Sequence, residues 1–241
     1  MSVTLEKGIP IASTSMMSFN GSPNHILYYP RSFPHSLIVG RTGSGKSYAA
    51  RYWMYQFLNC YPNAKLYLLD FKNEFNFPQL PRYYTNFDCV QGMKSFVKEM
   101  GERQESHNVD KPPILLYIDE LSALLTFLEK KDAETFRHGI SLAYMVSRAQ
   151  NMFTLTGMQR ADASNWVAGA RDNISFVMLL GEFSKEGCEM FSLKKENMGA
   201  CPYPGMGHIL INGNSNSLLK IKIPFLRDTQ KIDRRIIEAL S

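Results

Sequence analysis

The stretch Gly40-Arg-Thr-Gly-Ser-Gly-Lys46-Ser47 directly follows the apolar segment Ser36-Leu-Ile-Val39 and precedes the helical pattern of residues 48–58. This order predicts a strand, a glycine-rich turn and a helix, with the glycines letting successive backbone N–H groups point inward around an anion. The spacing GxxxxGK[ST] is typical of a phosphate-binding loop, here called the P-loop. We therefore expect the turn to bind a nucleoside triphosphate.

The P-loop residues have separate expected tasks. Lys46 is expected to reach the β and γ phosphates, and the Ser47 hydroxyl is expected to ligate Mg²⁺, so the expected cofactors are ATP and Mg²⁺. The full set of expected nucleotide-binding residues is Gly40, Arg41, Thr42, Gly43, Ser44, Gly45, Lys46, Ser47 and Tyr48. The alternative, a glycine-rich turn without a ligand, is disfavoured by the strand-like and helical flanks.

The composition is that of an ordinary globular protein. With 241 residues, 44% of them hydrophobic, the chain is long enough for one large α/β domain. No run approaches the ~20 apolar residues of a membrane span, and the N-terminus lacks the pattern of a secretory signal. We therefore expect a cytoplasmic protein with no membrane segment of its own. The net charge of +5 is compatible with a polyanionic partner but is too small to indicate one.

Apolar strand-like runs alternate with amphipathic segments along most of the chain. The expected strands are 36–39, 65–70, 114–119, 153–156, 174–180, 207–211 and 217–223, and the expected helices are 46–59, 90–106, 121–129, 133–150, 184–192 and 228–240. This rhythm predicts an α/β fold with a mostly parallel central sheet, helices on both faces and a C-terminal β-hairpin. Prolines and glycines up to Pro34 argue for loops and for a short hairpin before the core. Residues 1–34 are therefore expected to be a lead-in segment, and residues 35–241 the domain.

Two carboxylates follow the apolar run of residues 114–118. Asp119, at the end of the expected strand, is the natural Mg²⁺ partner beside the P-loop. Glu120 points differently and is expected to align and deprotonate an attacking water, a step that hydrolysis requires. The alternative is an acidic N-cap for the helix that begins at Leu121. With the P-loop present, the pair favours a hydrolase over a passive nucleotide binder.

A polar pair, Gln159 and Arg160, ends the next strand-like run. In a parallel sheet this run should lie beside the Asp119 strand, so Gln159 is expected to touch the γ phosphate or its attacking water. The alternative is a polar residue that merely ends a strand. Guanine-specific switching is disfavoured because no Asn-Lys-x-Asp run occurs, and a cassette of the ABC type because no Leu-Ser-Gly-Gly-Gln run precedes Asp119.

Further motifs occur in a fixed order along the chain. They are Pro34-His35 before the P-loop, Leu69-Asp70-Phe-Lys72-Asn-Glu74-Phe75, Asp119-Glu120-Leu121, Ser147-Arg148-Ala149, Gln159-Arg160 and Gly169-Ala-Arg171-Asp-Asn173. In this order they resemble the FtsK/SpoIIIE branch of the FtsK–HerA superfamily of DNA-pumping ATPases, over roughly residues 26–230. The chain departs from the family where Phe71 and Ala161 replace prolines, Met158 replaces the sensor threonine and Arg171 replaces a lysine.

The resemblance implies a P-loop NTPase fold of RecA/FtsK type and an ATPase that pumps double-stranded DNA as a homo-oligomeric ring, usually a hexamer. ATP would lie between subunits, where an arginine of the neighbour neutralises the γ phosphate; Arg148, Arg171 and Arg160 are the candidates, with surface ion pairs as the alternative. By analogy, residues 71–82 and 129–132 would form DNA-gripping loops. Those loops offer Lys72, Arg82, Lys130 and Lys131, with solvated surface charge as the alternative.

The membrane-spanning and winged-helix parts of the larger chromosomal relatives have no counterpart in this sequence, which favours the motor core of a phage, plasmid or other mobile element. The close alternative is a genome-packaging or conjugative coupling ATPase, with a capsid, relaxase or transfer channel as partner. From a different class, the alternative is a nucleotide-dependent switch or assembly factor that hydrolyses ATP without moving anything.

Overall fold

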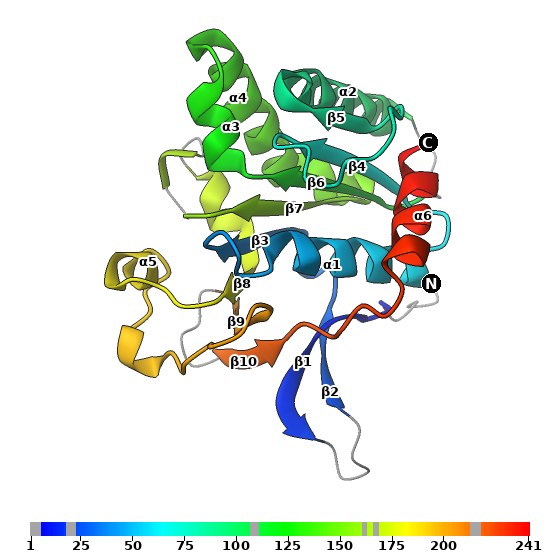
Figure 1. Cartoon of the computed structure of the whole chain (residues 1–241). Coiled ribbons are helices and arrows are strands. Elements are labelled where there is room, and N and C mark those ends of the chain that lie inside the picture. The colour runs from blue at the N-terminus through cyan, green and yellow to red at the C-terminus, as the bar shows by residue number, and fades with distance from the viewer. Residues whose placement is uncertain (1–5, 18–22, 107–110, 161–162, 166–168, 213–217) are drawn as a thin grey trace.

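The computed structural model describes residues 6–17, 23–106, 111–160, 163–165, 169–212 and 218–241. Its strands are β1 (Ile9–Met17), β2 (Pro23–Tyr28), β3 (His35–Gly40), β4 (Lys65–Asp70), β5 (Tyr83–Thr85), β6 (Ile114–Asp119), β7 (Met152–Met158), β8 (Ile174–Leu180), β9 (Met206–Ile211) and β10 (Leu219–Lys222). Within the described part these strands form one sheet in the order β2-β1-β10-β9-β8-β3-β7-β6-β4-β5 (Figure 1).

The helices surround this sheet. They are α1 (Lys46–Cys60), α2 (Cys89–Glu105), α3 (Leu121–Phe127), α4 (Lys130–Val146), α5 (Lys185–Glu189) and α6 (Thr229–Leu240), with short 3₁₀ turns η1 (Asn86–Asp88), η2 (Ser147–Gln150), η3 (Ala163–Asn165), η4 (Ala170–Asn173) and η5 (Lys195–Asn197). One hydrophobic cluster joins α1 and α6 to one face of the sheet, and a second joins α2, α3 and α4 to the other (Figure 1).

The parallel half of the sheet runs from β8 to β5 and confirms the expected fold class. Strand β3 pairs in parallel with both β7 and β8, and β6 pairs in parallel with β7 and β4. Along β3, Leu37 and Val39 pack into one hydrophobic cluster while Ile38 packs into the other. Burial on both faces explains why these strands are continuous apolar runs in the sequence rather than alternating ones. All their carboxyl ends lie at one edge, where the P-loop begins.

The antiparallel half contains the expected C-terminal hairpin, because β10 pairs with β9 and β9 pairs with β8. Its far end comes from the N-terminal segment. Strands β1 and β2 pair with each other and join the sheet through β10, so part of the 1–34 segment forms the expected hairpin and belongs to the central sheet. Pro10 lies where the register of β1 against β2 shifts, and such an irregularity tolerates a proline that a regular ladder would not.

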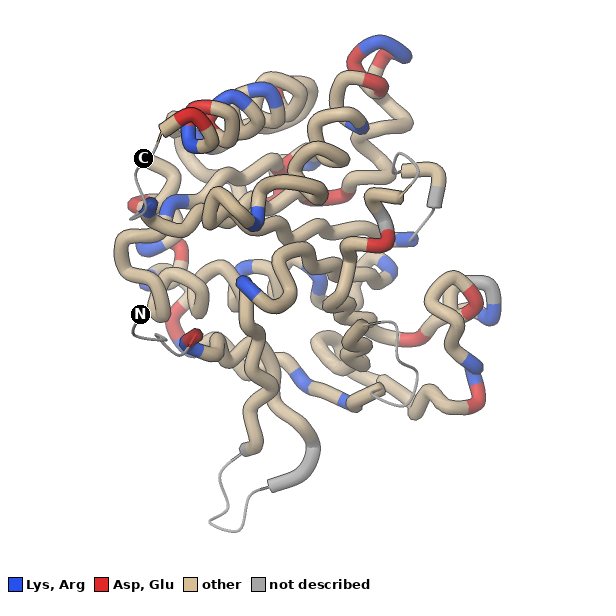
Figure 2. Tube along the Cα trace, turned by 180° about the vertical axis from the view of Figure 1, so that it is seen from behind, with Lys and Arg blue, Asp and Glu red and all other residues tan. Residues whose placement is uncertain are grey.

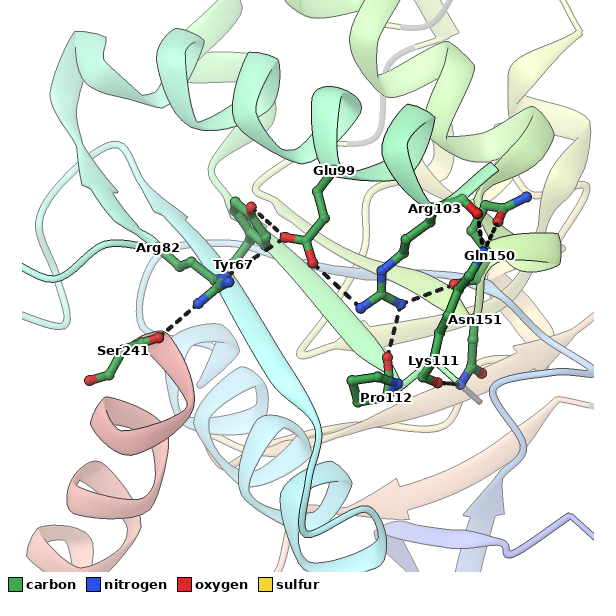
Figure 3. A network of polar contacts seen from close by, with 9 residues as sticks. All are labelled: Tyr67, Arg82, Glu99, Arg103, Lys111, Pro112, Gln150, Asn151 and Ser241. Atoms are coloured by element: carbon green, nitrogen blue, oxygen red, sulfur yellow. Dashed lines mark hydrogen bonds and ion pairs between the residues drawn. The ribbon is translucent and has the colours of Figure 1, made fainter. Parts of the chain in front are cut away.

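A buried polar network holds the edge of the sheet opposite the P-loop (Figure 3). Arg103 of α2 is 8% exposed, and its Nη1 donates to the carbonyls of Pro112 at 2.9 Å and of Gln150 at 3.1 Å. Its Nη2 lies 3.4 Å from Glu99 Oε1, and the Lys111 ammonium donates back to the Arg103 carbonyl. Arg103 therefore provides a hydrogen-bond donor for two backbone carbonyls that lie just before β6 and β7.

We expect Arg103→Met to lower the free energy of unfolding by about 2–3 kcal/mol, because two carbonyls and the Glu99 carboxylate lose a charged donor. Lys98→Met is the matched control on the same helix. The Lys98 side chain is 79% exposed and, among the described residues, pairs only with Glu102, so its loss should change the free energy by less than about 0.5 kcal/mol. Urea denaturation of the nucleotide-free protein measures both values, and equal effects of the two variants would contradict the assignment.

Candidate active site

The P-loop is a tight turn whose backbone requires glycine. Gly43 and Gly45 have φ of +80° and +95°, in the left-handed region that side chains disfavour. A Cβ on Gly45 would also lie 2.9 Å from the backbone nitrogen of Gly205. That nitrogen donates to the Ser44 carbonyl at 2.8 Å, so the segment before β9 supports the turn from behind.

Helix α1 begins at Lys46 with Gly45 as its N-cap, and among the described residues no side chain caps it. The first N–H groups of the helix are therefore available to an anion, as the helix dipole favours. Arg41 and Thr42 are exposed on the turn. The Tyr48 hydroxyl instead donates to the Pro224 carbonyl at 3.2 Å, which anchors the strand-like segment after β10 to α1.

Asp119 ends β6 with one oxygen engaged and one left over. Tyr117 donates its hydroxyl proton to Asp119 Oδ1 at 2.8 Å. Oδ2 has no hydrogen-bond partner among the described residues, and the whole of Asp119 is buried, with 1% of its surface exposed. Burial raises the pKa of Asp119 to about 7, against the lowering effect of the Tyr117 hydrogen bond and with the help of the nearby Glu74, Glu120 and Asp70 charges. An unsatisfied carboxylate oxygen at the end of β6, on the sheet edge where the P-loop begins, fits a hard divalent cation such as Mg²⁺.

Glu120 follows in a strained conformation. Its φ of +51° is left-handed, which costs a non-glycine residue about 1–2 kcal/mol. Its side chain is 3% exposed and its Oε1 lies 2.8 Å from Lys46 Nζ, which is itself 7% exposed. Lys72 Nζ lies 3.8 Å from the same oxygen. The αL turn thus directs the Glu120 carboxylate to the start of α1, and such outliers concentrate at functional sites.

The loop after β4 completes this cluster. The Ser47 hydroxyl donates to the Glu74 carboxylate. Asp70 holds the loop in place, because its Oδ1 accepts from the Glu74 backbone N–H and its Oδ2 accepts from that of Phe75, each at 2.9 Å. Asp70 and Glu74 belong to a motif of the FtsK resemblance, but no local sequence pattern predicts their contacts in the site.

Gln159 and Arg160 follow β7, the strand between β3 and β6. Both line a cavity of about 430 Å³ together with Arg41 of the P-loop and Glu182. The structure therefore places the polar pair beside the P-loop turn, on the side away from the β4–β5 loop. The expected contact of Gln159 with the γ phosphate or its attacking water stays a prediction.

The candidate arginines are widely separated. Arg148 is exposed in η2, just before β7, whereas Arg160 follows the other end of that strand. A strand of this length separates its ends by about 20 Å, so Arg148 lies far from the P-loop of its own chain. The side chain of Arg171 lies outside the described part of the structure.

The four expected DNA-contact residues also differ in setting. Lys72 is half-exposed beside Glu120, and Lys130 and Lys131 are exposed at the start of α4. Arg82 instead belongs to the network of Figure 3, where its Nη1 donates to the Ser241 carbonyl at 2.7 Å and its guanidinium lies 5.5 Å from the Tyr67 ring centre. Basic positions are interspersed with acidic ones over the fold (Figure 2).

Residues 32–177 match the family model described as "Helicase HerA, central domain". The match covers more than half of the chain. The chain belongs to the HerA helicase central-domain family. This membership confirms the resemblance to the FtsK–HerA superfamily, whose members share the P-loop ATPase fold described above.

One relative of this HerA-family chain is the FtsK domain-containing protein YdcQ of Bacillus subtilis (strain 168), 26% identical over 186 residues that cover 69% of the chain and 38% of YdcQ. Among solved structures, EssC (ATPases 2 and 3) from Geobacillus thermodenitrificans has a TM-score of 0.73 at 18% identity, covering 99% of this chain and 50% of EssC. The pCW3 conjugation coupling protein TcpA, solved with ATPγS, has a TM-score of 0.72 at 20% identity, covering 99% and 71%.

The two structural likenesses show the fold alone at these identities, and the HerA-family chain spans 38% of YdcQ and half of the EssC chain. Among the described helices, none is both long and apolar enough to cross a membrane.

The raised pKa of Asp119 predicts how metal-free stability depends on pH. The unfolded carboxyl ionises near 3.8 and the folded one at about 7, so the folded state loses stability as pH rises between these values. Asp119→Asn removes this loss while keeping an acceptor for Tyr117. We expect the variant to be more stable than the parent at pH 8, by at most about 4 kcal/mol, and equally stable at pH 4.

Denaturant unfolding at both pH values in the presence of a chelator measures this difference. A stability difference that stays constant with pH would contradict the cause given for the shift.

Proposed function

We propose that this chain is an ATP-hydrolysing motor that moves double-stranded DNA as a ring of identical subunits. One observation carries the hydrolytic part: Glu120 lies buried 2.8 Å from Lys46, one residue beyond an Asp119 whose Oδ2 has no partner among the described residues. A base in contact with a phosphate-binding lysine, and next to a carboxylate free to hold a metal, is what ATP hydrolysis needs.

The residues would act in a simple order. The N–H groups at the start of α1 and Lys46 take the phosphates, and Ser47 and Asp119 hold Mg²⁺. When bound, Mg²⁺ neutralises charge on the β and γ phosphates. The Lys46 ammonium cannot contact the phosphates and keep its full contact with Glu120 at the same time, so triphosphate binding weakens the Lys46–Glu120 ion pair. The freed Glu120 carboxylate then orients water and accepts its proton.

The ring is supported by the position of Arg148. At about 20 Å from the P-loop edge, this exposed arginine cannot reach the γ phosphate of its own subunit, so as a finger it would act only across a subunit boundary. Arg160, beside the P-loop, and Arg171 stay as alternative candidates for the same task. A heterologous contact that closes on itself yields a ring, and the hexamer is the form that the FtsK resemblance favours.

DNA as the partner is supported by the HerA and FtsK relationship and by the fold shared with TcpA, a conjugation coupling protein. Lys72, Lys130 and Lys131 are the accessible cations for phosphate contacts, whereas Arg82 is engaged elsewhere. A packaging or coupling ATPase would use the same ATP-hydrolysing motor domain and differ in its docking partner, such as a capsid, relaxase or transfer channel. A non-translocating switch would hydrolyse ATP without responding to DNA.

Glu120→Gln should leave ATP binding near normal and lower the turnover rate by about 10²- to 10⁴-fold, because the amide cannot accept the proton of water. Glu134→Gln, at an exposed glutamate on α4, is the matched control and should keep full turnover. Phosphate release and binding of a fluorescent ATP analogue measure the two quantities. Retained turnover in Glu120→Gln would remove its assignment as the base.

Long duplex DNA should raise the turnover rate of ring-forming protein. The double variant Lys130→Ala/Lys131→Ala should weaken DNA binding and reduce the slope of log affinity against log salt by about 2, since two phosphate contacts are lost. Lys98→Ala, at an exposed lysine on α2, is the control and should keep the parental slope. If duplex fails to stimulate a preparation that forms rings, the switch replaces the translocase.

A further inference from the structure

Glu74 is the side chain that contacts the expected metal ligand Ser47. The two residues are 27 positions apart and belong to different elements, α1 and the β4–β5 loop, yet the Ser47 hydroxyl donates to Glu74 Oε2. Glu74 is exposed, so burial does not hold its side chain there. The hydrogen bond itself, and the loop that presents the carboxylate, therefore define its position.

The direction of this hydrogen bond matters for metal binding. A serine hydroxyl has one proton and two lone pairs. When the proton points to a carboxylate, both lone pairs are free for a cation, and the serine oxygen becomes a stronger ligand of that cation. When no acceptor is present, the hydroxyl rotates freely and one orientation points the proton toward the metal. Partners of this kind orient metal ligands and strengthen their binding.

The β4–β5 loop is built to hold Glu74 still. Asp70 is fully buried and caps the backbone N–H groups of Glu74 and Phe75, and the Tyr83 hydroxyl donates to Asp70 Oδ2 at 2.9 Å. Phe75 is 5% exposed and its ring centre lies 5.9 Å from that of Tyr117. A loop with its backbone satisfied and one aromatic side chain packed in the core has little freedom to shift.

The same loop is linked to Asp119, the second expected metal ligand. Tyr117, on which Phe75 packs, donates to Asp119 Oδ1 and so fixes the carboxylate whose Oδ2 is buried without a partner among the described residues. Lys72, two residues before Glu74, reaches Glu120 at 3.8 Å. Three neighbouring loop residues thus touch Ser47, Glu120 and the support of Asp119.

We propose that Glu74 is a positioning residue of the metal–nucleotide site, which accepts the Ser47 proton so that the Ser47 oxygen faces Mg²⁺. The proposal rests on the proposed function only in requiring that the site bind a magnesium nucleotide. It is independent of DNA and of the ring.

The test measures binding of a fluorescent, non-hydrolysable ATP analogue to the full chain while Mg²⁺ is varied. Glu74→Ala should raise the Mg²⁺ concentration for half-maximal binding about tenfold, since loss of such a partner costs metal affinity on this scale. Glu74→Gln should change it less than about threefold, because its amide oxygen accepts the same proton. Binding with a chelator present should be equal in all variants. Glu134→Ala, an exposed glutamate on α4, is the matched control and should behave as the parent.

Each other outcome overturns the assignment. An unchanged Mg²⁺ requirement in Glu74→Ala means that Ser47 needs no partner, and a lowered requirement means that Glu74 competes with the metal. A loss in Glu74→Gln as large as in Glu74→Ala means that charge acts instead of the hydrogen bond. Failure of the proposed function is distinguishable, because the parent protein would then show no Mg²⁺-dependent nucleotide binding at all.

Discussion

The buried ion pair between Lys46 and Glu120 is the contact on which the geometry of the site depends. Each partner follows a different parallel strand, β3 or β6, with β7 between them, and the two meet only because the strand ends share one edge. Burying two charges is expensive, and such a pair adds little net stability compared with apolar residues of similar size. Its retention in the core is better explained by chemistry than by folding.

The parallel half of the fold could be predicted because its strands carry their signal locally. Strands β4, β6 and β8 are short apolar runs bounded by turns, and burial on both faces of the sheet produces that composition. The short hairpin expected beside loops in the 1–34 segment could not be given bounds, because Pro10 and Pro23 read as breakers and the irregular register that accommodates them depends on the partner strand. Strand β5, three residues long, is too short for any period to show.

The candidate site could be predicted only where it is contiguous in sequence. Lys46, Ser47, Asp119 and Glu120 come together as the P-loop and strand-end patterns imply, while their chemical roles stay predictions. The contacts of Glu74 with Ser47 and of Gly205 with Ser44 join residues far apart in the chain, which no local pattern encodes. Arg82 looked like a loop cation, and only the fold reveals the Glu99 carboxylate and Ser241 carbonyl that surround it.

The left-handed backbone of Glu120 makes the strain of one residue depend on the ion pair that its side chain forms. Glycine adopts this conformation freely, so replacement by glycine relieves about 1–2 kcal/mol of strain. The same replacement leaves Lys46 buried without its carboxylate, which costs about 3–5 kcal/mol. Because the loss exceeds the relief, the fold itself holds the expected base in its strained conformation before any ligand is bound.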